Sequence, residues 1–518
     1  MWSGISSKFI LSRAFPPFTF TSGLCYYASV SDQPVIIPRS DHPISRKWIS
    51  QNAIRVLYRL KESGHLAYLV GGGVRDLLLG REPKDFDIAT DAKPNEIKKI
   101  FRNCRLIGRR FRLAHVHFHD EIIEVATFRS NVTDEEAASG AAANAASDAS
   151  ADAKVVQRTD AALPPSAAAP GPVPAERPRP PRMLMSDEGM ILRDNVFGTP
   201  EQDAIRRDFT VNALFYGIAD YAVIDYVGGM EDLRKGLIRI IGDPVVRFTE
   251  DPVRMVRAVR FASMLGFEIE ETTYAALLEH KDKIALASPA RMYEEVQKLF
   301  LLGEGEKTFQ MLRHTGMFGV LFPHINAWID TEEDGFPHTW VGKALEWVDT
   351  CIHAGRKVQP HILFSLMFGQ YIMAKAARLR SGGMAPLEAL DTAVAEFLAE
   401  TVPRVQLPRK AALAMREILW NQGRFEKTQG KAPLYFLRRP VFTEAFEYLR
   451  FTSELTGERL ELRAWWKEFI RAHPAVPGEA VPEQELKAAP LLARTQDAQK
   501  RRRRRPRRRG PKPGAPKT

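Results

Sequence analysis

Apolar residues recur at helical spacing in the stretch SRKWISQNAIRVLYRLKESG, residues 45–64. They fall at positions 49, 54, 57 and 60, which lie on one side of a helix. Gly64 then closes the segment, as glycine commonly does after a last helical turn. We therefore expect a helix with one buried face at this point in the chain.

Short apolar runs and helical segments alternate over the next part of the chain. AYLVGGGVRDLLLG, residues 67–80, predicts a buried strand, a glycine turn and a short helix. A strand containing DFD and a helix opened by Pro94 follow, and RLIGRRFRLAHVHFH and EIIEVATFR predict two further strands. This strand–helix–strand–helix–strand–strand order predicts a small mixed sheet with helices.

The pattern changes twice further along. Residues 131–181 are dominated by Ala, Ser, Asp and Pro, a composition that predicts a disordered insertion in a surface loop. From about residue 203 to 480 helical spacing dominates, except that residues 221–242 predict a strand pair around a turn and a short helix. The predicted fold class is α+β, with a small mixed-sheet head followed by an all-α neck and body.

The formal net charge of +11 comes from one end of the chain. Residues 500–518 contain 11 Lys and Arg and no Asp or Glu, so the preceding residues are formally neutral. A like-charge block of this density does not pack, and we expect a disordered tail. Its predicted role is electrostatic contact with nucleic acid, and the alternative is a tail that aids solubility or meets another anionic surface.

Cysteines and apolar runs bear on the cellular setting. Three cysteines, Cys25, Cys104 and Cys351, lack disulfide or metal spacing, which indicates a reducing compartment, the cytoplasm. No apolar run reaches the roughly 18 residues of a membrane span. The first 31 residues contain no acid, which fits an unstructured or mis-started N-terminus or, alternatively, a transit peptide.

Two acids one residue apart, Asp85 and Asp87, occur in EPKDFDIATD. Residues i and i+2 of a strand face the same side, so these carboxylates are expected to lie side by side and repel each other. A divalent cation turns the repulsion into attraction, although a lone pair of this kind is more often a polar strand end. Glu124 in IIEVATFR and Asp208 in RRDFTVNAL are candidates for a third metal-facing acid. The alternatives are a salt bridge from Glu124 to an arginine and an ion pair of Asp208 at a helix start.

A glycine-rich turn, GGGVRD at residues 71–76, precedes these acids. It lies between a predicted strand and a predicted helix, where glycines let a ligand approach the backbone closely and the helix start offers free N–H donors. Arg75 adds a positive charge. A tight turn without a ligand is the alternative for this motif alone, but the DxD nine residues later strengthens the phosphate-binding interpretation.

The glycine turn and the DxD strand together resemble the nucleotidyltransferase superfamily of the DNA polymerase beta type. The resemblance implies that Asp85 and Asp87, with one of the two candidate third acids, bind two magnesium ions. It also implies that Gly72, Gly73 and Arg75 hold a nucleoside triphosphate, here ATP. One ion would lower the pKa of an attacking 3′-hydroxyl, and the other would stabilise the leaving pyrophosphate.

DAIRRDFTVNALFYG (203–217) and TEDPVRMVRAVRFA (249–262) make the resemblance more specific. With GGGVRD and DFD they occur in the order found in class II nucleotidyltransferases, the family of tRNA nucleotidyltransferases and bacterial poly(A) polymerases. The resemblance implies that the RRD stretch contacts the incoming nucleotide and that the EDxxR helix reads its base. The residues concerned are Arg207, Asp208, Asp251 and Arg254.

Spacing on the EDxxR helix fits this role. Asp251 and Arg254 are three residues apart and share one helix face, where they offer acceptors and donors to the Watson–Crick edge of a base. Asp251 is also placed to cap a helix that begins at Pro252, and both roles are compatible. Arg254, Arg257 and Arg260 recur every three residues and predict a basic stripe facing phosphate or solvent.

Further stretches resemble the bacterial poly(A) polymerase branch of this family: LIGRRFRLAHV, ISRKWISQNA, YVGGMEDL, SPARMYEE and the Arg-rich tail. That branch implies addition of AMP from ATP to RNA 3′ ends, with RNA-decay proteins as candidate partners. The alternative is a CCA-adding tRNA nucleotidyltransferase, which uses CTP and then ATP. A second alternative is an RNA-binding module with an inactive head.

The resemblance also sets the expected divisions of the chain. These are an unstructured N-terminus (1–35), a catalytic head (36–220) containing the insertion (131–181), a nucleotide-recognition neck (221–330), a helical RNA-binding body (331–480) and a disordered Arg-rich tail (481–518).

Two other patterns carry weaker signals. His115, His117 and His119 alternate, so they share one strand face, and we expect solvent-facing histidines rather than a zinc site. Trp465 and Trp466 lie among basic residues, where stacking on RNA bases is one interpretation. Packing in the core of an amphipathic helix is the favoured one.

Overall fold

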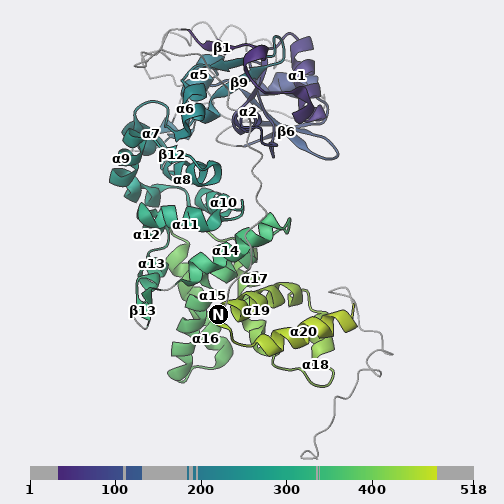
Figure 1. Ribbon diagram of the computed structural model, residues 1–518, viewed down its shortest axis with the longest axis vertical. Helices are drawn as coiled ribbons and strands as arrows, with labels where there is room; N and C mark the ends of the chain where they lie inside the picture. Colours follow the sequence, from purple (N-terminus) through teal and green to yellow (C-terminus); the bar gives the residue numbers. More distant parts are fainter. Residues whose placement is uncertain are drawn as a thin grey trace, which may run out of the picture.

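The computed structural model describes residues 33–108, 113–130, 184–185, 191–193, 197–333, 336–337 and 339–474. The predicted insertion at 131–181, the first 31 residues and the Arg-rich tail lie outside the described residues. Figure 1 shows an elongated molecule with a sheet-containing head at one end and helices through most of the rest. The predicted α+β class, a mixed-sheet head followed by a largely helical body, is confirmed.

The head is built on a mixed sheet whose described strands run in the order β1-β10-β9-β2-β3-β6-β5-β4. Strand β3 is parallel to β6, and the other neighbouring strands are antiparallel. Their bounds are Val35–Ile37 (β1), Ala67–Val70 (β2), Asp87–Thr90 (β3), Cys104–Ile107 (β4), Leu113–His117 (β5), Ile122–Thr127 (β6), Leu214–Gly217 (β9) and Val223–Asp225 (β10).

Helix α1, Gln51–Glu62, confirms the helix expected from the apolar spacing. The side chain of Ser50 accepts hydrogen bonds from the first backbone N–H groups, which otherwise lack partners. Leu57 and Leu60 are fully buried, and the chain turns at Gly64 with φ +86°. The buried face of α1 therefore covers one face of the sheet.

The remaining helices of the head are short. They are η1 (Arg39–Asp41), η2 (Arg46–Trp48), α2 (Gly72–Leu78), α3 (Pro94–Ile100), α5 (Pro200–Ile205), η3 (Thr210–Asn212) and α6 (Gly229–Lys235). A separate strand pair joins β7 (Leu184–Met185) and β8 (Ile191–Arg193).

The strand predicted over RLIGRRFRLAHVHFH is wrong in one respect, because the segment forms two strands. Strands β4 and β5 pair antiparallel, with Cys104 opposite Val116. Gly108 follows β4 with φ +97°, a conformation that favours glycine and turns the chain out of the strand. Apolar spacing alone did not distinguish one long strand from this hairpin.

The strand pair predicted within residues 221–242 is also wrong in its pairing. Strand β10 joins the head sheet between β1 and β9 instead of pairing with its successor. That successor, β11 (Leu237–Ile238), pairs in parallel with β12 (Glu268–Ile269). The short helix predicted between them is present as α6, and the sheet of the head extends past residue 220.

Helices continue from the head through the rest of the described chain. The first group is α7 (Pro244–Glu250), α8 (Val253–Leu265), α9 (Glu271–His280), η4 (Lys281–Leu286), α10 (Pro289–Phe300), α11 (Gly305–His314), α12 (Met317–Leu321) and α13 (Pro323–Ile329). A strand pair, β13 (Glu332–Glu333) and β14 (Phe336–Pro337), follows. The second group is α14 (Trp340–His353), α15 (Pro360–Ser381), α16 (Pro386–Thr401), α17 (Arg409–Trp420), η5 (Asn421–Arg424), α18 (Ala432–Leu437), α19 (Phe442–Thr456) and α20 (Leu460–Ala472).

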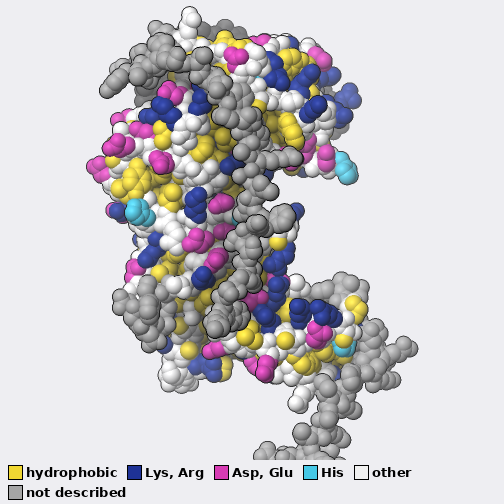
Figure 2. All heavy atoms as spheres, in the orientation of Figure 1, with side chains coloured by type: hydrophobic (Ala, Val, Ile, Leu, Met, Phe, Trp, Pro, Cys, Tyr) yellow, Lys and Arg dark blue, Asp and Glu magenta, His cyan; other side chains and the backbone are white. Residues whose placement is uncertain are grey.

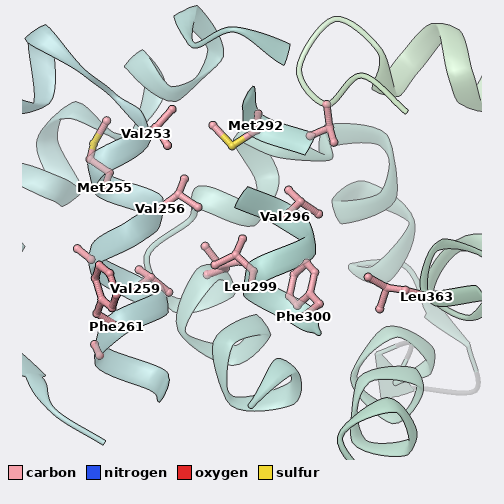
Figure 3. Close-up of a cluster of buried hydrophobic side chains, with 14 of the residues drawn as sticks. Val253, Met255, Val256, Val259, Phe261, Met292, Val296, Leu299, Phe300 and Leu363 are labelled. Carbon is pink, nitrogen blue, oxygen red and sulfur yellow. The ribbon is translucent and has the colours of Figure 1, made fainter. Parts of the chain in front are cut away.

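The core runs without interruption from the head into the helices. Figure 3 shows Val256 and Val259 of α8 facing Val296 and Leu299 of α10, and all four side chains are buried. Burial of each such side chain contributes roughly 1.5–3 kcal/mol. The head is therefore joined to the helices by an apolar interface and not by a linker.

A second cluster gathers at the C-terminal helices. Trp466 is fully buried there, and its indole N–H donates a hydrogen bond of 2.9 Å to the carbonyl of Phe425. The favoured interpretation of Trp466 as a core residue is confirmed. Within the described ranges, no helix combines the length and the apolar character that crossing a membrane requires.

Candidate active site

Three acidic side chains meet at one end of the parallel strand pair. Asp87 opens β3 and lies in register with Glu124 on β6, so both side chains point to the same face of the sheet. Asp85 lies two residues earlier, in the loop before β3, whereas the sequence predicted it inside the strand. Asp85, Asp87 and Glu124 all keep exposed surface.

The electrostatics of Asp87 reflect this crowding. Partial burial by surrounding protein atoms, followed by the negative charges of Glu124 and Asp85, raises the pKa of Asp87 to about 6, and Arg207 opposes the shift. Asp85 and Glu124 therefore act on Asp87 as like charges. A carboxylate under such repulsion gains from a nearby cation.

The glycine turn lies against these acids. Gly71, buried with φ +73°, has room for no side chain, because a Cβ there would lie 3.3 Å from an Arg207 guanidinium nitrogen and 3.8 Å from an Asp87 oxygen. A Cβ on Gly73 would lie 3.3 Å from the backbone carbonyl of Asp85. Gly71 was missed in the sequence analysis, although its position directly after a buried strand was the available signal.

Arg207 joins the turn to the acids. Its guanidinium donates to Asp203 at 2.9 Å and lies over the ring of Phe215 at 5.3 Å. These contacts hold the charge beside Gly71 and within electrostatic range of Asp87. Asp203 was not identified from the sequence, although it lies four residues before Arg207 on the same turn of chain.

Arg75 is buried and already engaged. It donates to Asp76 at 2.7 Å and to Asn212 at 2.6 Å. A Cβ on Gly72 would lie 3.5 Å from its guanidinium, so Arg75 fills the space beneath the turn.

Asp208 lies apart from the acidic group. Arg257 on α8 holds its carboxylate with a 2.7 Å hydrogen bond and a 2.5 Å ion pair, and the N–H of Phe209 donates to it at 2.9 Å. Burial alone would raise the pKa of Asp208, but the Arg257 guanidinium overrides it and lowers the value to about 2. The ion-pair alternative describes these contacts, and they give Glu124 the place beside Asp87.

Asp251 and Arg254 lie at the junction of α7 and α8. Asp251 binds Arg291 through two contacts of 2.7 Å each and also accepts a hydrogen bond from the N–H of Val253, so it caps α8. Arg254 binds Glu250 at 2.9 Å. Glu250 and Arg291 were missed in the sequence analysis, since partners this far apart in the chain leave no local pattern.

The basic stripe predicted on α8 does not face solvent. Arg260 is buried, and Arg257 and Arg260 both approach Glu295 on α10, at 3.6 and 3.4 Å. The prediction failed because matching acids on a neighbouring helix turn a basic face into a buried ionic network.

The histidines lie as expected from their spacing. His115 and His117 share one face of β5, with ring centroids 6.3 Å apart, and His119 is exposed beyond the end of the strand. His115 approaches Glu124 at 3.4 Å. In the parts of the chain that the structure covers, no group of three or more His, Cys, Asp or Glu side chains is arranged to hold a metal ion.

A mixed sheet with a glycine turn packed on paired acids, followed by helices that carry an acid and an arginine, defines a class II nucleotidyltransferase. The fold agrees with that of the Bacillus stearothermophilus CCA-adding enzyme in complex with CTP. That structure is 22% identical, with a TM-score of 0.52, and the match covers 85% of this chain and 91% of that one.

Sequence comparison narrows the class. The chain is 40% identical over 442 residues to poly(A) polymerase I of Salmonella typhimurium, which covers 85% of this chain and 86% of the relative. A CCA-adding enzyme of Bacillus velezensis is 31% identical over 287 residues, 55% of this chain and 59% of the relative. The chain belongs to the bacterial poly(A) polymerase I family, and CCA-adding enzymes are more distant relatives.

Three family models match successive parts of the chain. Residues 67–239 match the poly A polymerase head domain, residues 266–329 match a probable RNA and SrmB-binding site of polymerase A, and residues 382–509 match the polymerase A arginine-rich C-terminus. The first range includes β10 and β11, in agreement with a head that extends beyond residue 220.

Proposed function

We propose that this protein is a polynucleotide adenylyltransferase, which adds AMP from ATP to RNA 3′ ends without a template and thereby promotes RNA turnover. The observation that carries the proposal is the 40% identity to a poly(A) polymerase I over 85% of the chain. The paired acids beside the glycine turn supply the chemistry that such an enzyme needs.

Asp85 and Asp87, with Glu124 as the third acid, fit a pair of magnesium ions. Carboxylate oxygens are the donors that magnesium prefers, and the mutual repulsion that raises the pKa of Asp87 is relieved by a cation. When bound, the ions supply activation of the 3′-hydroxyl and charge neutralisation at the leaving pyrophosphate. Asp208, held by Arg257, orients the RRD segment in this scheme and takes its catalytic part by positioning.

The triphosphate lies along the glycine turn in this proposal. Gly72 and Gly73 allow its close approach, Arg207 provides a charge beside Gly71, and Arg75 supports the turn from below. Burial and the guanidinium groups of neighbouring arginines lower the pKa of Arg206 to about 9, so positive charge accumulates on this side of the cleft. Such a concentration of positive charge favours a polyanion.

Asp251 and Arg254 read the adenine in this proposal. Arg291 fixes Asp251, while Glu250 and the carbonyl of Arg247 fix Arg254. Side chains locked by such bonds discriminate between bases better than mobile ones, because a mismatched base leaves them unpaired.

The reaction is an in-line displacement. The RNA 3′-hydroxyl loses its proton and its oxygen attacks the α-phosphate of ATP, so a phosphodiester bond forms as the bond to pyrophosphate breaks. The residues of the chain contribute positioning and charge, which dominate catalysis of phosphoryl and nucleotidyl transfer.

The helical body holds the RNA. Figure 2 shows the molecule hollowed on the side between the head and the C-terminal helices, with Lys and Arg side chains on the lower rim. Exposed basic residues on this part of the chain are Arg409, Lys410, Lys427, Lys431 and Arg439. We assign the neck to residues 240–330, after the extended head, and the body to 331–480.

The region 266–329 is the proposed contact for RNA-decay partners, in keeping with the SrmB-binding description of its family model. The setting proposed is the bacterial cytoplasm, since Cys104 and Cys351 are free thiols.

The experiment that tests the function uses purified protein with an oligoadenylate primer and, separately, a tRNA that lacks its terminal nucleotides. We expect long tails on the primer from ATP alone. Addition of three nucleotides to the tRNA with a requirement for CTP would favour the CCA-adding alternative, which the 31% identical relative supports. Release of pyrophosphate in either reaction excludes an inactive RNA-binding module.

Deleting residues 500–518 is expected to raise the KM for RNA, because this segment carries 11 positive charges. Each lost phosphate contact should reduce the slope of log binding constant against log salt by about 0.7. Replacing every arginine of the tail with lysine keeps the charge and serves as the control. An unchanged salt slope after deletion contradicts the role of the tail in binding RNA.

A further inference from the structure

A tryptophan and several basic side chains are exposed together on the head. Trp48 is 61% exposed at the end of η2, directly after Arg46 and Lys47, which are exposed as well. Arg55 and Arg59 follow on the exposed face of α1. We call these five residues the outer head surface. An aromatic ring of this size left in water between cations is the composition of a site that binds single-stranded nucleic acid.

The outer head surface lies on the opposite face of the sheet from the acids. Phe215 of β9 and Asp87 of β3 are both in register with Val70, so they share one face. Tyr216, the next residue of β9, points to the other face, where it lines a cavity with Arg46 and Lys47. The site is therefore separate from the catalytic cleft.

Two hollows flank α1 on this side. A cavity of about 500 Å³ is lined by Arg39, Ser45, Arg46, Lys47, Gln51, Ile54, Tyr216 and Tyr221. A second, of about 290 Å³, is lined by Arg55, Val56, Arg59, Ile100, Phe101, Arg102, Asn103 and Phe118. Each combines cationic side chains with aromatic ones, and neither has an acid in its lining. Since Ile54 and Arg55 are adjacent on α1, the exposed face of this helix bridges the two hollows.

The first cavity is held in a defined shape. Tyr221 has φ +58°, an uncommon conformation for a residue with a side chain, and such backbone strain is concentrated at functional sites. Arg46 donates to the hydroxyls of Tyr58 and Tyr221, each at 3.3 Å. The imidazole of His42 is bonded to the carbonyl of Tyr221 at 2.9 Å.

The nearby acids leave the positive charge largely uncompensated. Asp41 accepts from Ser40 at 2.7 Å, and Asp120 accepts from Asn52 at 3.1 Å. Glu121 accepts from the hydroxyl of Ser50, the residue that caps α1. These acids bind neutral groups, and none of them forms an ion pair with an arginine or lysine of the outer head surface in the part of the chain described.

We propose that the outer head surface binds a segment of single-stranded RNA upstream of the 3′ end, with a base stacked on Trp48 and phosphates on the four basic residues. The proposal rests on RNA being the substrate, as set out above. Because the acids face the other side of the sheet, an RNA has to pass around the edge of the head to occupy both sites. Only an RNA longer than that path engages both, so the surface selects for length.

The test uses the full chain and two 5′-fluorescent oligoadenylates, one short and one long. Fluorescence anisotropy without ATP gives binding constants and their salt dependence, and AMP incorporation gives KM and kcat. The variants are Trp48→Ala and the double variant Arg55→Gln with Arg59→Gln. The double variant Arg234→Gln with Lys235→Gln, exposed on α6 of the same head, is the matched control.

We expect Trp48→Ala to weaken binding of the long RNA roughly tenfold. The Arg55→Gln and Arg59→Gln pair should reduce the salt slope for the long RNA by about 1.4, the value for two lost phosphate contacts on a single strand. Binding of the short RNA and its kcat should stay at the parent values.

Unchanged binding of the long RNA in both outer-surface variants overturns the proposal, and retention of an acidic protein instead would then assign the surface to that partner. Equal losses on short and long RNA also overturn it, because they indicate a general effect on the head. Absence of AMP incorporation by the parent refutes the proposed function and leaves the anisotropy result to decide this inference by itself.

Discussion

Asp87→Asn is expected to reduce AMP incorporation by about 10³-fold or more while the protein still binds RNA. Asparagine keeps the size of the side chain and removes the charge that would hold a magnesium ion at the start of β3. Primer extension with labelled ATP measures the loss, and anisotropy with an oligoadenylate shows that RNA binding is retained. Asp85→Asn is expected to have the same effect from the adjoining loop.

The matched control is Asp91→Asn, directly after the other end of β3. Asp91 is exposed, approaches His65 at 3.2 Å and accepts a hydrogen bond from the N–H of Leu66 at 2.9 Å. Its replacement changes one carboxylate in the same segment and leaves the acidic group intact, so activity should remain near that of the parent. Substantial AMP incorporation by Asp87→Asn would refute the metal assignment.

Asp208→Ala is expected to lower the free energy of unfolding by about 3–5 kcal/mol. Asp208 is 12% exposed, and its removal leaves the Arg257 guanidinium buried with only the more distant Glu295, at 3.6 Å, as a partner. The loss is measured by urea denaturation followed by fluorescence. Glu468→Ala, which breaks the pair with Arg471 in which both side chains are more than half exposed, is the control, and its effect should stay below about 1 kcal/mol.

The same pair gives a pH dependence of defined sign. The pKa of Asp208 is lowered from 3.8 to about 2 in the folded protein, so its contribution to stability is present above pH 4 and is lost as the pH falls toward 2. The difference in unfolding free energy between the parent and Asp208→Asn should shrink over that interval. A difference that stays constant from pH 7 to the acid limit would show that the charge of Asp208 does not stabilise the fold.

Local patterns in the sequence were sufficient for several features. The helix at 51–62 follows from apolar spacing and a capping serine, and the glycine turn beside the paired acids follows from two short motifs. The motifs also located the segments that carry Arg207 and Asp251. In each of these cases the determining contacts lie within a few residues of one another in the chain.

Features that depend on distant partners were not predictable in the same way. The register that places Glu124 beside Asp87 is set by pairing of strands 37 residues apart, and the ion pair of Asp208 with Arg257 joins the head to α8. The arginines of α8 show the consequence, because Glu295 on α10 converts an apparent surface stripe into a buried network. Periodicity reports which residues share a face but not what lies opposite.

The RRD segment is bound from the neighbouring helices at three points. Arg247 donates to the carbonyls of Arg206 and Arg207, both at 2.6 Å, and Arg257 holds Asp208. Swinging the head away from α7 and α8 would break all of these bonds together. We therefore expect ATP to enter, and pyrophosphate to leave, through an opening of constant width between one nucleotide addition and the next.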